Sequence, residues 1–321
     1  MATAEQIKSL IKSHLNDDSQ QFYTVALQVA AHESKKGHRD LAHNIRELVN
    51  NQRQKVDNRI LSFPKELNEL VDVRYPDTPK TALVIPRQLQ NRIDRVIREF
   101  QQQNKLKSYG LSHRRKLLLV GPPGTGKTMT AQVLSNKLDI PLGVIQVDKL
   151  VTKYMGETSA KLRQIFNLIN QETAVYLFDE FDAIGGERSF DNDVGEMRRV
   201  LNSFLQFIEQ DQSNSVIVSA TNNPKLLDQA LFRRFDDILH YDKPDRELSK
   251  KLMKNILGTF IPNSLSWNTV LSETEGLSHA DIVGACTDVI KENILGDKDK
   301  ATDQQLLTTI KERKLYYKIQ E

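Results

Sequence analysis

The sequence of 321 residues has little cysteine and no long apolar run. Its single cysteine, Cys286, excludes an internal disulfide, and we expect a small buried residue there rather than a nucleophile. No stretch is apolar over the roughly 20 residues that a bilayer-spanning helix needs, and the amino end carries no signal-peptide pattern. These absences predict a soluble, cytoplasmic chain with no membrane insertion.

The chain also has little net charge. Its 45 basic and 42 acidic residues leave a formal charge of +3, with both signs well mixed. Such a balance gives no electrostatic argument for nucleic acid as a partner. The length exceeds what one compact core usually organises, so two or three domains are expected.

A glycine-rich stretch is the most informative feature that is present. It follows the apolar run 116–120 and precedes a helical pattern over 129–138, so it joins a strand to a helix. Backbone N–H groups of such a loop, with the helix N-terminus behind them, can cradle phosphates, and its lysine and threonine suit the terminal phosphates and Mg²⁺. The residues expected to bind the nucleotide here are Gly121, Pro122, Pro123, Gly124, Thr125, Gly126, Lys127, Thr128 and Met129.

Two carboxylates follow a second apolar run, 175–178. Four apolar residues in succession are typical of a strand that is covered on both faces of a parallel sheet, and ligands bind at the carboxyl edge of such sheets. There Asp179 can hold Mg²⁺ together with Thr128, while Glu180 polarises the attacking water. A pair of solvated acids at a strand end is the alternative, which the upstream loop makes the weaker interpretation.

The order of patterns predicts four segments. Residues 1–51 contain three amphipathic helical patterns, and they form either a partner-docking domain or a cap on the main domain. Residues 52–80 are polar and proline-containing, as in a linker. Residues 81–244 alternate strands and helices, which indicates a parallel sheet, and residues 245–321 are all-helical. The expected strands are 116–120, 142–147, 174–178, 215–220 and 237–241.

Read together, these motifs resemble the AAA family of the AAA+ ATPases, from about Leu83 to the carboxyl end. Residues 121–128 are similar to its Walker A motif, 175–180 to its Walker B motif, and 219–224 to its sensor-1 segment. The resemblance implies an α/β fold: a P-loop NTPase core with a parallel five-stranded sheet, a small helical lid and a helical N-terminal domain. It also implies ATP and Mg²⁺ as cofactors, with Asn222 beside the γ-phosphate and the attacking water.

Residues 231–236 resemble the family segment that carries arginine fingers. The resemblance implies that Arg233 and Arg234 act in a neighbouring subunit's site, and therefore a homo-oligomeric ring, hexameric by analogy. The family's commonest form separates these arginines by a Pro-Gly insert. Their adjacency here resembles the meiotic clade, which includes katanin and spastin, and leaves open which arginine is the dominant finger. A solvated basic turn is the alternative.

Three further segments resemble the family. Tyr154-Met155-Gly156 is similar to the loop that grips polypeptide in the ring's central pore, and 185–193 resembles a second pore loop. Tyr109 and Gly110 stand at the family's spacing before the phosphate loop and are expected to frame the base. The lid motif is present over 276–281, but His279 replaces its glycine. The N-terminal hairpin resembles MIT or TPR helices.

Three functions fit this pattern. The leading hypothesis is a protein remodeller that threads polypeptide through its pore and is recruited through residues 1–51. The alternative is a nucleotide-dependent regulator that switches a bound partner enzyme, for example a separately encoded protease, without threading. A loader that acts on DNA is disfavoured by the near-neutral charge and by the pore motif.

Overall fold

The computed structural model describes residues 19–57, 69–150, 157–182, 194–224, 229–262 and 264–318, together with Lys8. The chain divides into two compact units, Met1–Ser62 and Phe63–Glu321. The first of the three helical patterns expected near the amino end lies outside the described residues. No helix within the described ranges is long and apolar enough to cross a membrane.

The first unit is a hairpin of α2 (Ser19–Lys35) and α3 (Arg39–Asp57). Gly37, whose φ is +91°, makes the turn between them. Small side chains let the helices approach, since Ala30 and Ala42 are both buried in the contact. At the turn, His38 Nδ1 lies 2.6 Å from Glu33 Oε2. This hydrogen bond lowers the pKa of Glu33. Helix α3 ends six residues beyond the predicted boundary at 51.

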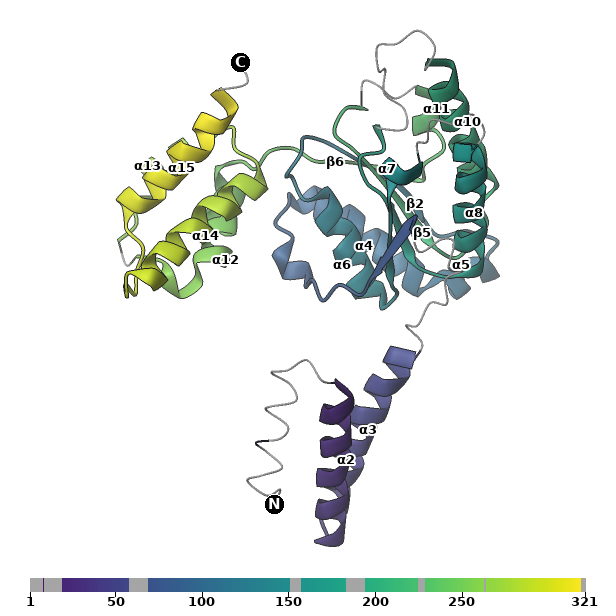
Figure 1. The fold of residues 1–321 in the computed structure, drawn as a ribbon, viewed down its shortest axis with the longest axis horizontal. Coiled ribbons are helices and arrows are strands. Elements are labelled where there is room, and N and C mark those ends of the chain that lie inside the picture. The colour runs from purple at the N-terminus through teal and green to yellow at the C-terminus, as the bar shows by residue number, and fades with distance from the viewer. Residues whose placement is uncertain are drawn as a thin grey trace. The chain divides into compact units, whose positions relative to one another are not determined.

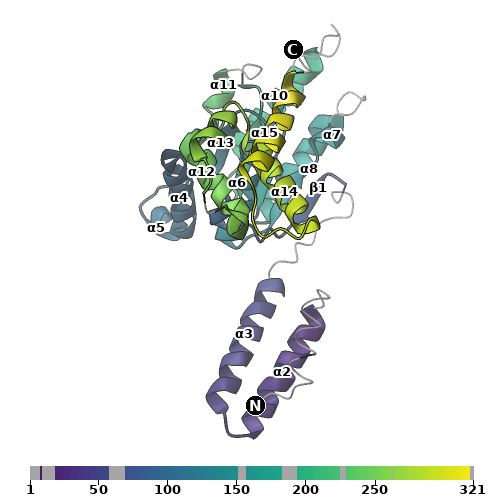
Figure 2. The ribbon, with the colours of Figure 1, turned by 90° about the vertical axis from the view of Figure 1, so that its left-hand side faces the viewer.

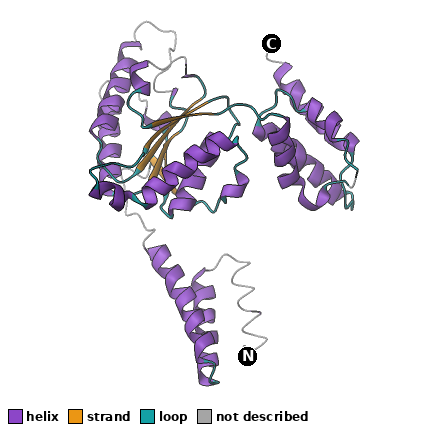
Figure 3. Cartoon of the chain, turned by 180° about the vertical axis from the view of Figure 1, so that it is seen from behind, coloured by secondary structure: helices purple, strands orange, loops and turns teal. Residues whose placement is uncertain are grey.

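The second unit is built on a six-stranded sheet with the order β1-β3-β4-β5-β2-β6. Five strands run parallel, as predicted, and β1 is antiparallel to β3. Figure 3 shows the sheet between its helices. The strands are β1 (Val71–Arg74), β2 (Lys116–Val120), β3 (Leu142–Ile145), β4 (Val175–Phe178), β5 (Val216–Thr221) and β6 (Asp237–His240).

Strand β1 corrects the prediction that 52–80 is a linker. Val71-Asp72-Val73-Arg74 alternates apolar and polar residues over only four positions, and Pro76 follows at once. A short edge strand of this kind has a weak sequence signal. Its pairing with β3 supplies the stability that the local sequence does not.

Helices cover both faces of the sheet (Figure 1). On one face α4 and α6 bury Ile93, Val96 and Leu134 against the strands. On the other face, Phe166 of α8 and Phe204 of α10 lie against Phe178 of β4. The bounds are α4 (Arg87–Gln101), α5 (Gln103–Ser108), α6 (Lys127–Leu138), α7 (Val147–Leu150), α8 (Glu157–Gln171), α10 (Val194–Gln210) and α11 (Gln229–Phe232), with a 3₁₀ turn at Lys80–Ala82.

The carboxyl-terminal part is all-helical, as predicted. Figure 2 shows its helices side by side. They are α12 (Arg246–Leu257), α13 (Trp267–Glu273), α14 (His279–Leu295) and α15 (Asp303–Lys318), with a 3₁₀ turn at Gly258–Phe260. Cys286 is buried in their core, and burial raises the pKa of its thiol to about 12. A thiol in that environment is a packing residue, which confirms the expectation.

Candidate active site

The glycine-rich loop joins β2 to α6, and its glycines are required by close packing. A Cβ on Gly121 would lie 2.0 Å from the backbone oxygen of Tyr241. Gly124 and Gly126 have φ values of +72° and +102°, a conformation that favours glycine. The three glycines leave the N–H groups at the start of α6 free of side-chain bulk. This is the geometry that a phosphate group needs.

Lys127, the first residue of α6, points its ammonium group into the loop. Its Nζ donates hydrogen bonds to the carbonyl oxygens of Gly121 and Pro122 and to Asn222 Oδ1, each at 2.8 Å. Burial lowers the pKa of Lys127, and the carboxylates of Asp179 and Asp182 oppose that shift. A bound phosphate would offset the desolvation of this buried cation. Lys127 is thus placed where phosphate charge is most favourable.

The two carboxylates stand where the sequence predicts them, directly after β4. Thr128 Oγ1 donates a hydrogen bond of 2.6 Å to Asp179 Oδ2. The hydroxyl and the carboxylate therefore converge from α6 and β4, and two oxygen ligands with room for water suit Mg²⁺. Glu180 is exposed and has a φ of +50°, which is uncommon for a residue other than glycine.

Asn222 follows β5, the strand next to β4. Its amide oxygen accepts the hydrogen bond from Lys127, and its backbone N–H donates to Asp182 Oδ1 at 3.3 Å. Asp182 was not singled out from the sequence. Its position two residues after Glu180 is the signal that could have identified it, because the turn after β4 lies beside the end of the neighbouring strand β5.

These groups line one cavity of about 990 Å³. Its walls include the phosphate loop, Met129, Asp179, Glu180 and Asn222. The sequence reasoning missed residues 81–84, which lie ahead of the first parallel strand, and three apolar side chains of the lid. Those three are Leu252, Ile256 and Val283. They carry only an ordinary helical core pattern in the sequence.

The structure does not bring Tyr109 and Gly110 to this cavity. Both stand in the turn after α5, and Tyr109 is 75% exposed. Residues 81–84 line the cavity, whereas Tyr109 and Gly110 do not. Side chains of Leu83 and Ile85 pack into the α/β core, whereas Val84 packs into the core of the lid. The segment 83–85 therefore packs against both the α/β core and the lid, and Leu83 and Val84 also line the cavity.

The lid also contacts the phosphate loop directly. The backbone N–H of Ala280, at the start of α14, donates to the carbonyl oxygen of Gly124 at 3.0 Å. A Cβ on Gly124 would lie 2.6 Å from Ser278 Oγ. Ser278 and Ala280, at the start of α14, therefore close one side of the cavity.

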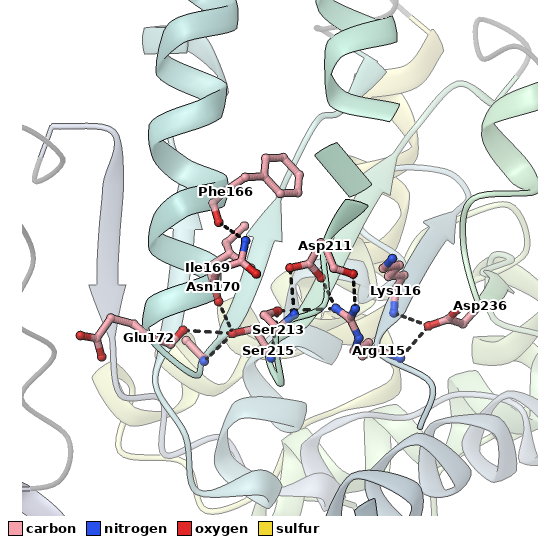
Figure 4. Close-up of polar contacts among 11 residues, drawn as sticks. Arg115, Lys116, Phe166, Ile169, Asn170, Glu172, Asp211, Ser213, Ser215 and Asp236 are labelled. Carbon is pink, nitrogen blue, oxygen red and sulfur yellow. Dashed lines mark hydrogen bonds and ion pairs between the residues drawn. The ribbon is translucent and has the colours of Figure 1, made fainter. Parts of the chain in front are cut away.

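Arg233 and Arg234 lie elsewhere, in the turn after α11. With Lys116, Glu209 and Asp236 they line a separate pocket. Figure 4 shows how this region is fixed: the carboxylate of Asp236 accepts hydrogen bonds of 2.9 Å from the backbone N–H groups of Arg115 and Lys116. Lys116 is the first residue of β2, and the phosphate loop begins after the last. The five-residue strand therefore separates Lys116 from the phosphate loop by roughly 16 Å. The arginines do not belong to the cavity of their own chain.

A buried ion pair supports the same end of β2. Arg115 donates to the carboxylate of Asp211, which is fully buried after α10 (Figure 4). Asp211 Oδ1 also accepts a hydrogen bond of 3.2 Å from the backbone of Ser213. The start of β2, the end of α10 and the turn with the arginines are therefore one connected framework. Tyr154 and Met155 lie outside the described residues, and so does the whole of the predicted second pore loop, 185–193.

Fold and site together define a nucleoside triphosphatase with a phosphate-binding loop and a helical lid. Residues 117–243 match the family model described as "ATPase family associated with various cellular activities (AAA)". The chain is 32% identical over 305 residues to an uncharacterised AAA family ATPase of Sinorhizobium fredii, which covers 92% of this chain and 90% of that protein. The chain belongs to the AAA family of ATPases and is an ATP-hydrolysing enzyme.

Other relatives share the same core. The proteasome-activating nucleotidase of Methanopyrus kandleri is 30% identical over 262 residues, covering 79% of this chain and 59% of that protein. The 26S proteasome regulatory subunit 7 homologue of Schizosaccharomyces pombe is 30% identical over 210 residues, covering 63% of this chain and 48% of that protein. The chain thus spans about half the length of these two relatives. The likeness to the meiotic clade and to MIT or TPR helices stays a prediction.

Proposed function

We propose that this ATPase is a protein remodeller that works as a ring in the cytoplasm and uses ATP hydrolysis to pull polypeptide through a central pore. The observation that carries the proposal is the separation of the site into two parts. Lys127, Glu180 and Asn222 surround one cavity, while the arginines lie at the opposite end of β2. Arginines placed there lie outside their own chain's cavity, which supports a role in the site of another subunit.

The chemistry of the site follows from the groups in the cavity. The phosphate loop and Lys127 bind the β- and γ-phosphates, and Thr128 with Asp179 would hold Mg²⁺. When bound, the metal ion neutralises phosphate charge. Glu180 orients and deprotonates the attacking water, and the amide of Asn222 positions that water beside the γ-phosphate. An amide adds no negative charge next to the phosphate, which favours this role.

A neighbouring subunit supplies the remaining charge. A guanidinium aimed at the γ-phosphate stabilises the negative charge of the transition state. The framework of Asp236, Arg115 and Asp211 fixes the segment with Arg233 and Arg234 at the subunit surface. We infer a hexameric ring on family analogy, with the client protein or a partner docked through residues 1–51.

Threading rests on Tyr154 and Met155, an aromatic and a flexible thioether that can grip side chains of any type. The test is unfolding of a tagged fluorescent client by the Tyr154→Ala variant, with Tyr154→Phe as the matched control. We expect normal ATP hydrolysis in both variants and client unfolding only in the Phe variant. Wild-type unfolding by Tyr154→Ala would contradict threading.

A regulator that switches a bound enzyme without threading is the second candidate. It is favoured by the relative named a proteasome-activating nucleotidase, because that name describes control of another enzyme. The two proposals differ in the role of the pore. Partner control that survives Tyr154→Ala but is lost in Lys127→Ala would establish the regulator instead.

A further inference from the structure

The basic residues of the chain are unevenly distributed. Residues 87–116, which run from the start of α4 to the start of β2, hold nine basic and two acidic residues. This segment has a net charge of +7, whereas the whole chain has a net charge of +3. Both of its carboxylates are paired, because Asp94 contacts Lys80 and Glu99 accepts a hydrogen bond of 2.6 Å from Arg114. The near-neutral charge of the whole chain therefore conceals one strongly basic region.

Contacts within this region hold the end of α4, the helix α5 and the turn before β2 together. Helix α5 lies beside the end of α4 (Figure 2). Phe100 of α4 packs edge to face on His113, with ring centroids 5.5 Å apart. Lys107 Nζ of α5 donates a hydrogen bond of 2.8 Å to Oδ1 of Asn214, in the turn before β5. The region therefore lies at the amino ends of β2 and β5, whereas the nucleotide cavity lies at the carboxyl ends of these parallel strands.

The cations on the outside of this region are exposed and lack acidic partners. Arg95 and Arg98 lie one turn apart on α4, away from its buried residues. Neither of them, nor Lys105 of α5, has an ion pair within the described parts of the chain. Tyr109, in the turn after α5, is 75% exposed, so its ring is left largely in water beside these cations. We call Arg95, Arg98, Lys105, Lys107 and Tyr109 the basic surface.

The residue types of the basic surface fit a nucleic acid better than an acidic protein segment. Guanidinium groups donate paired hydrogen bonds to phosphate oxygens. Residues 101–104, between the two groups of cations, are Gln-Gln-Gln-Asn, and amide side chains donate to phosphates and to base edges. An exposed aromatic ring stacks on an unpaired base, whereas carboxylates alone need no such ring. We propose that the basic surface binds single-stranded nucleic acid, with phosphates on its cations and a base on Tyr109.

The experiment measures binding of a fluorescent oligothymidylate of about 20 nucleotides to the full chain by anisotropy, over a series of salt concentrations. Saturating Mg·ADP is present, so the probe cannot bind in the nucleotide cavity. Arg95→Gln/Arg98→Gln removes two charges from the basic surface. Lys251→Gln/Lys311→Gln removes two exposed charges from the lid and is the matched control. Thermal unfolding of each variant checks that it is folded.

Two further variants test the aromatic ring. Tyr109→Ala removes it, and Tyr109→Phe keeps a ring that can stack. Unlabelled oligothymidylate and polyglutamate are compared as competitors of the probe, because polyglutamate supplies negative charge without bases.

We expect Arg95→Gln/Arg98→Gln to reduce the slope of log affinity against log salt by about 1.4, since each phosphate contact on a single strand contributes about 0.7. Near 0.1 M salt this corresponds to about 20-fold weaker binding. Tyr109→Ala should weaken binding about 5- to 150-fold without changing the slope, the value of one stacked base. Tyr109→Phe and the lid control should match the wild type.

Three results would overturn the proposal. They are no binding by the wild type at low salt, equal losses in the two double variants, and competition by polyglutamate as strong as by oligothymidylate with no effect of Tyr109→Ala. The last result would establish a surface for acidic protein segments instead. The proposal needs neither a ring nor a pore, so it is independent of the threading proposal.

Discussion

At the scale of single residues, we propose that the carboxylate of Glu180 serves ATP hydrolysis and not nucleotide binding. It lines the cavity without touching Lys127, which is held by two loop carbonyls and Asn222. The Glu180→Gln variant should therefore keep ATP affinity within about twofold of the wild type and lose about 10²- to 10⁴-fold in turnover, the usual contribution of a general base. Phosphate release and ATP binding, measured on one preparation, check this. Loss of binding together with turnover would show a structural role instead.

The two arginines differ in their surroundings, although the sequence leaves them equivalent. Arg234 forms an ion pair with Glu209, whereas Arg233 has no ion pair among the described residues. The pair is partly exposed and stabilises this position of Arg234 by no more than about 1 kcal/mol, so Arg234 can still adopt other positions. We predict that Arg233→Ala lowers turnover by about 10³-fold, as loss of an arginine finger does, and that Arg234→Ala costs less.

The Glu209→Gln variant tests that difference. If the ion pair keeps Arg234 from reaching the neighbouring subunit's site, adding Glu209→Gln to Arg233→Ala should raise the residual turnover by a few-fold. The reason is that breaking the pair costs only up to about 1 kcal/mol. Glu209→Gln alone should change little. Equal losses for the two alanine variants, with no effect of Glu209→Gln, would contradict the assignment.

Residue roles were predictable where several residue types stood in a fixed order. Residues 123–128, Asp179, Glu180 and Asn222 line one cavity, although the sequence places them far apart. Tyr109 and Gly110 were predicted from their spacing alone and do not line the cavity. Residues 81–84 line it instead. His279 also lines it, although the sequence shows this residue only as a departure from a motif. Its position depends on the packing of the lid against the loop, which no local pattern shows.

At the scale of elements, β2 connects the phosphate loop with the region around Arg233 and Arg234. Its carboxyl end leads into the phosphate loop, and its amino end is tied to α10 by the buried pair of Arg115 and Asp211. Breaking a buried pair leaves an unpaired charge. Asp211→Asn should therefore lower the free energy of unfolding by about 3–5 kcal/mol, as measured by chemical denaturation.

The exposed pair of Arg246 and Glu275 is the matched control. Both of its side chains are more than half exposed, so Glu275→Gln should cost less than about 1 kcal/mol. A similar small cost for Asp211→Asn would contradict a structural role for the buried pair and with it the framework that fixes the arginine turn.

Element types were predictable wherever periodicity was strong. All five parallel strands were found to within two residues at their ends, and all but β6 are buried along most of their length. Strand β1 was missed because an edge strand of four residues is half polar, and its pairing partner β3 lies about 70 residues away. Long-range pairing of that kind leaves no local signal.

At the scale of the whole molecule, the central claim is that one chain carries an incomplete site. We propose that Glu180 acts as the base within its own subunit and that Arg233 with Arg234 acts on the next one. A ring of identical subunits satisfies this arrangement, since every interface then contains one complete site.

Mixing two inactive variants tests this claim most directly. Arg233→Ala/Arg234→Ala subunits keep the base and lack the fingers, while Glu180→Gln subunits keep the fingers and lack the base. In a 1:1 mixture that exchanges subunits, about a quarter of the interfaces should pair an intact base with an intact finger, because assembly is random. We predict that ATP hydrolysis recovers to about that fraction of the wild-type rate. A mixture as inactive as its two components would contradict arginines acting between subunits.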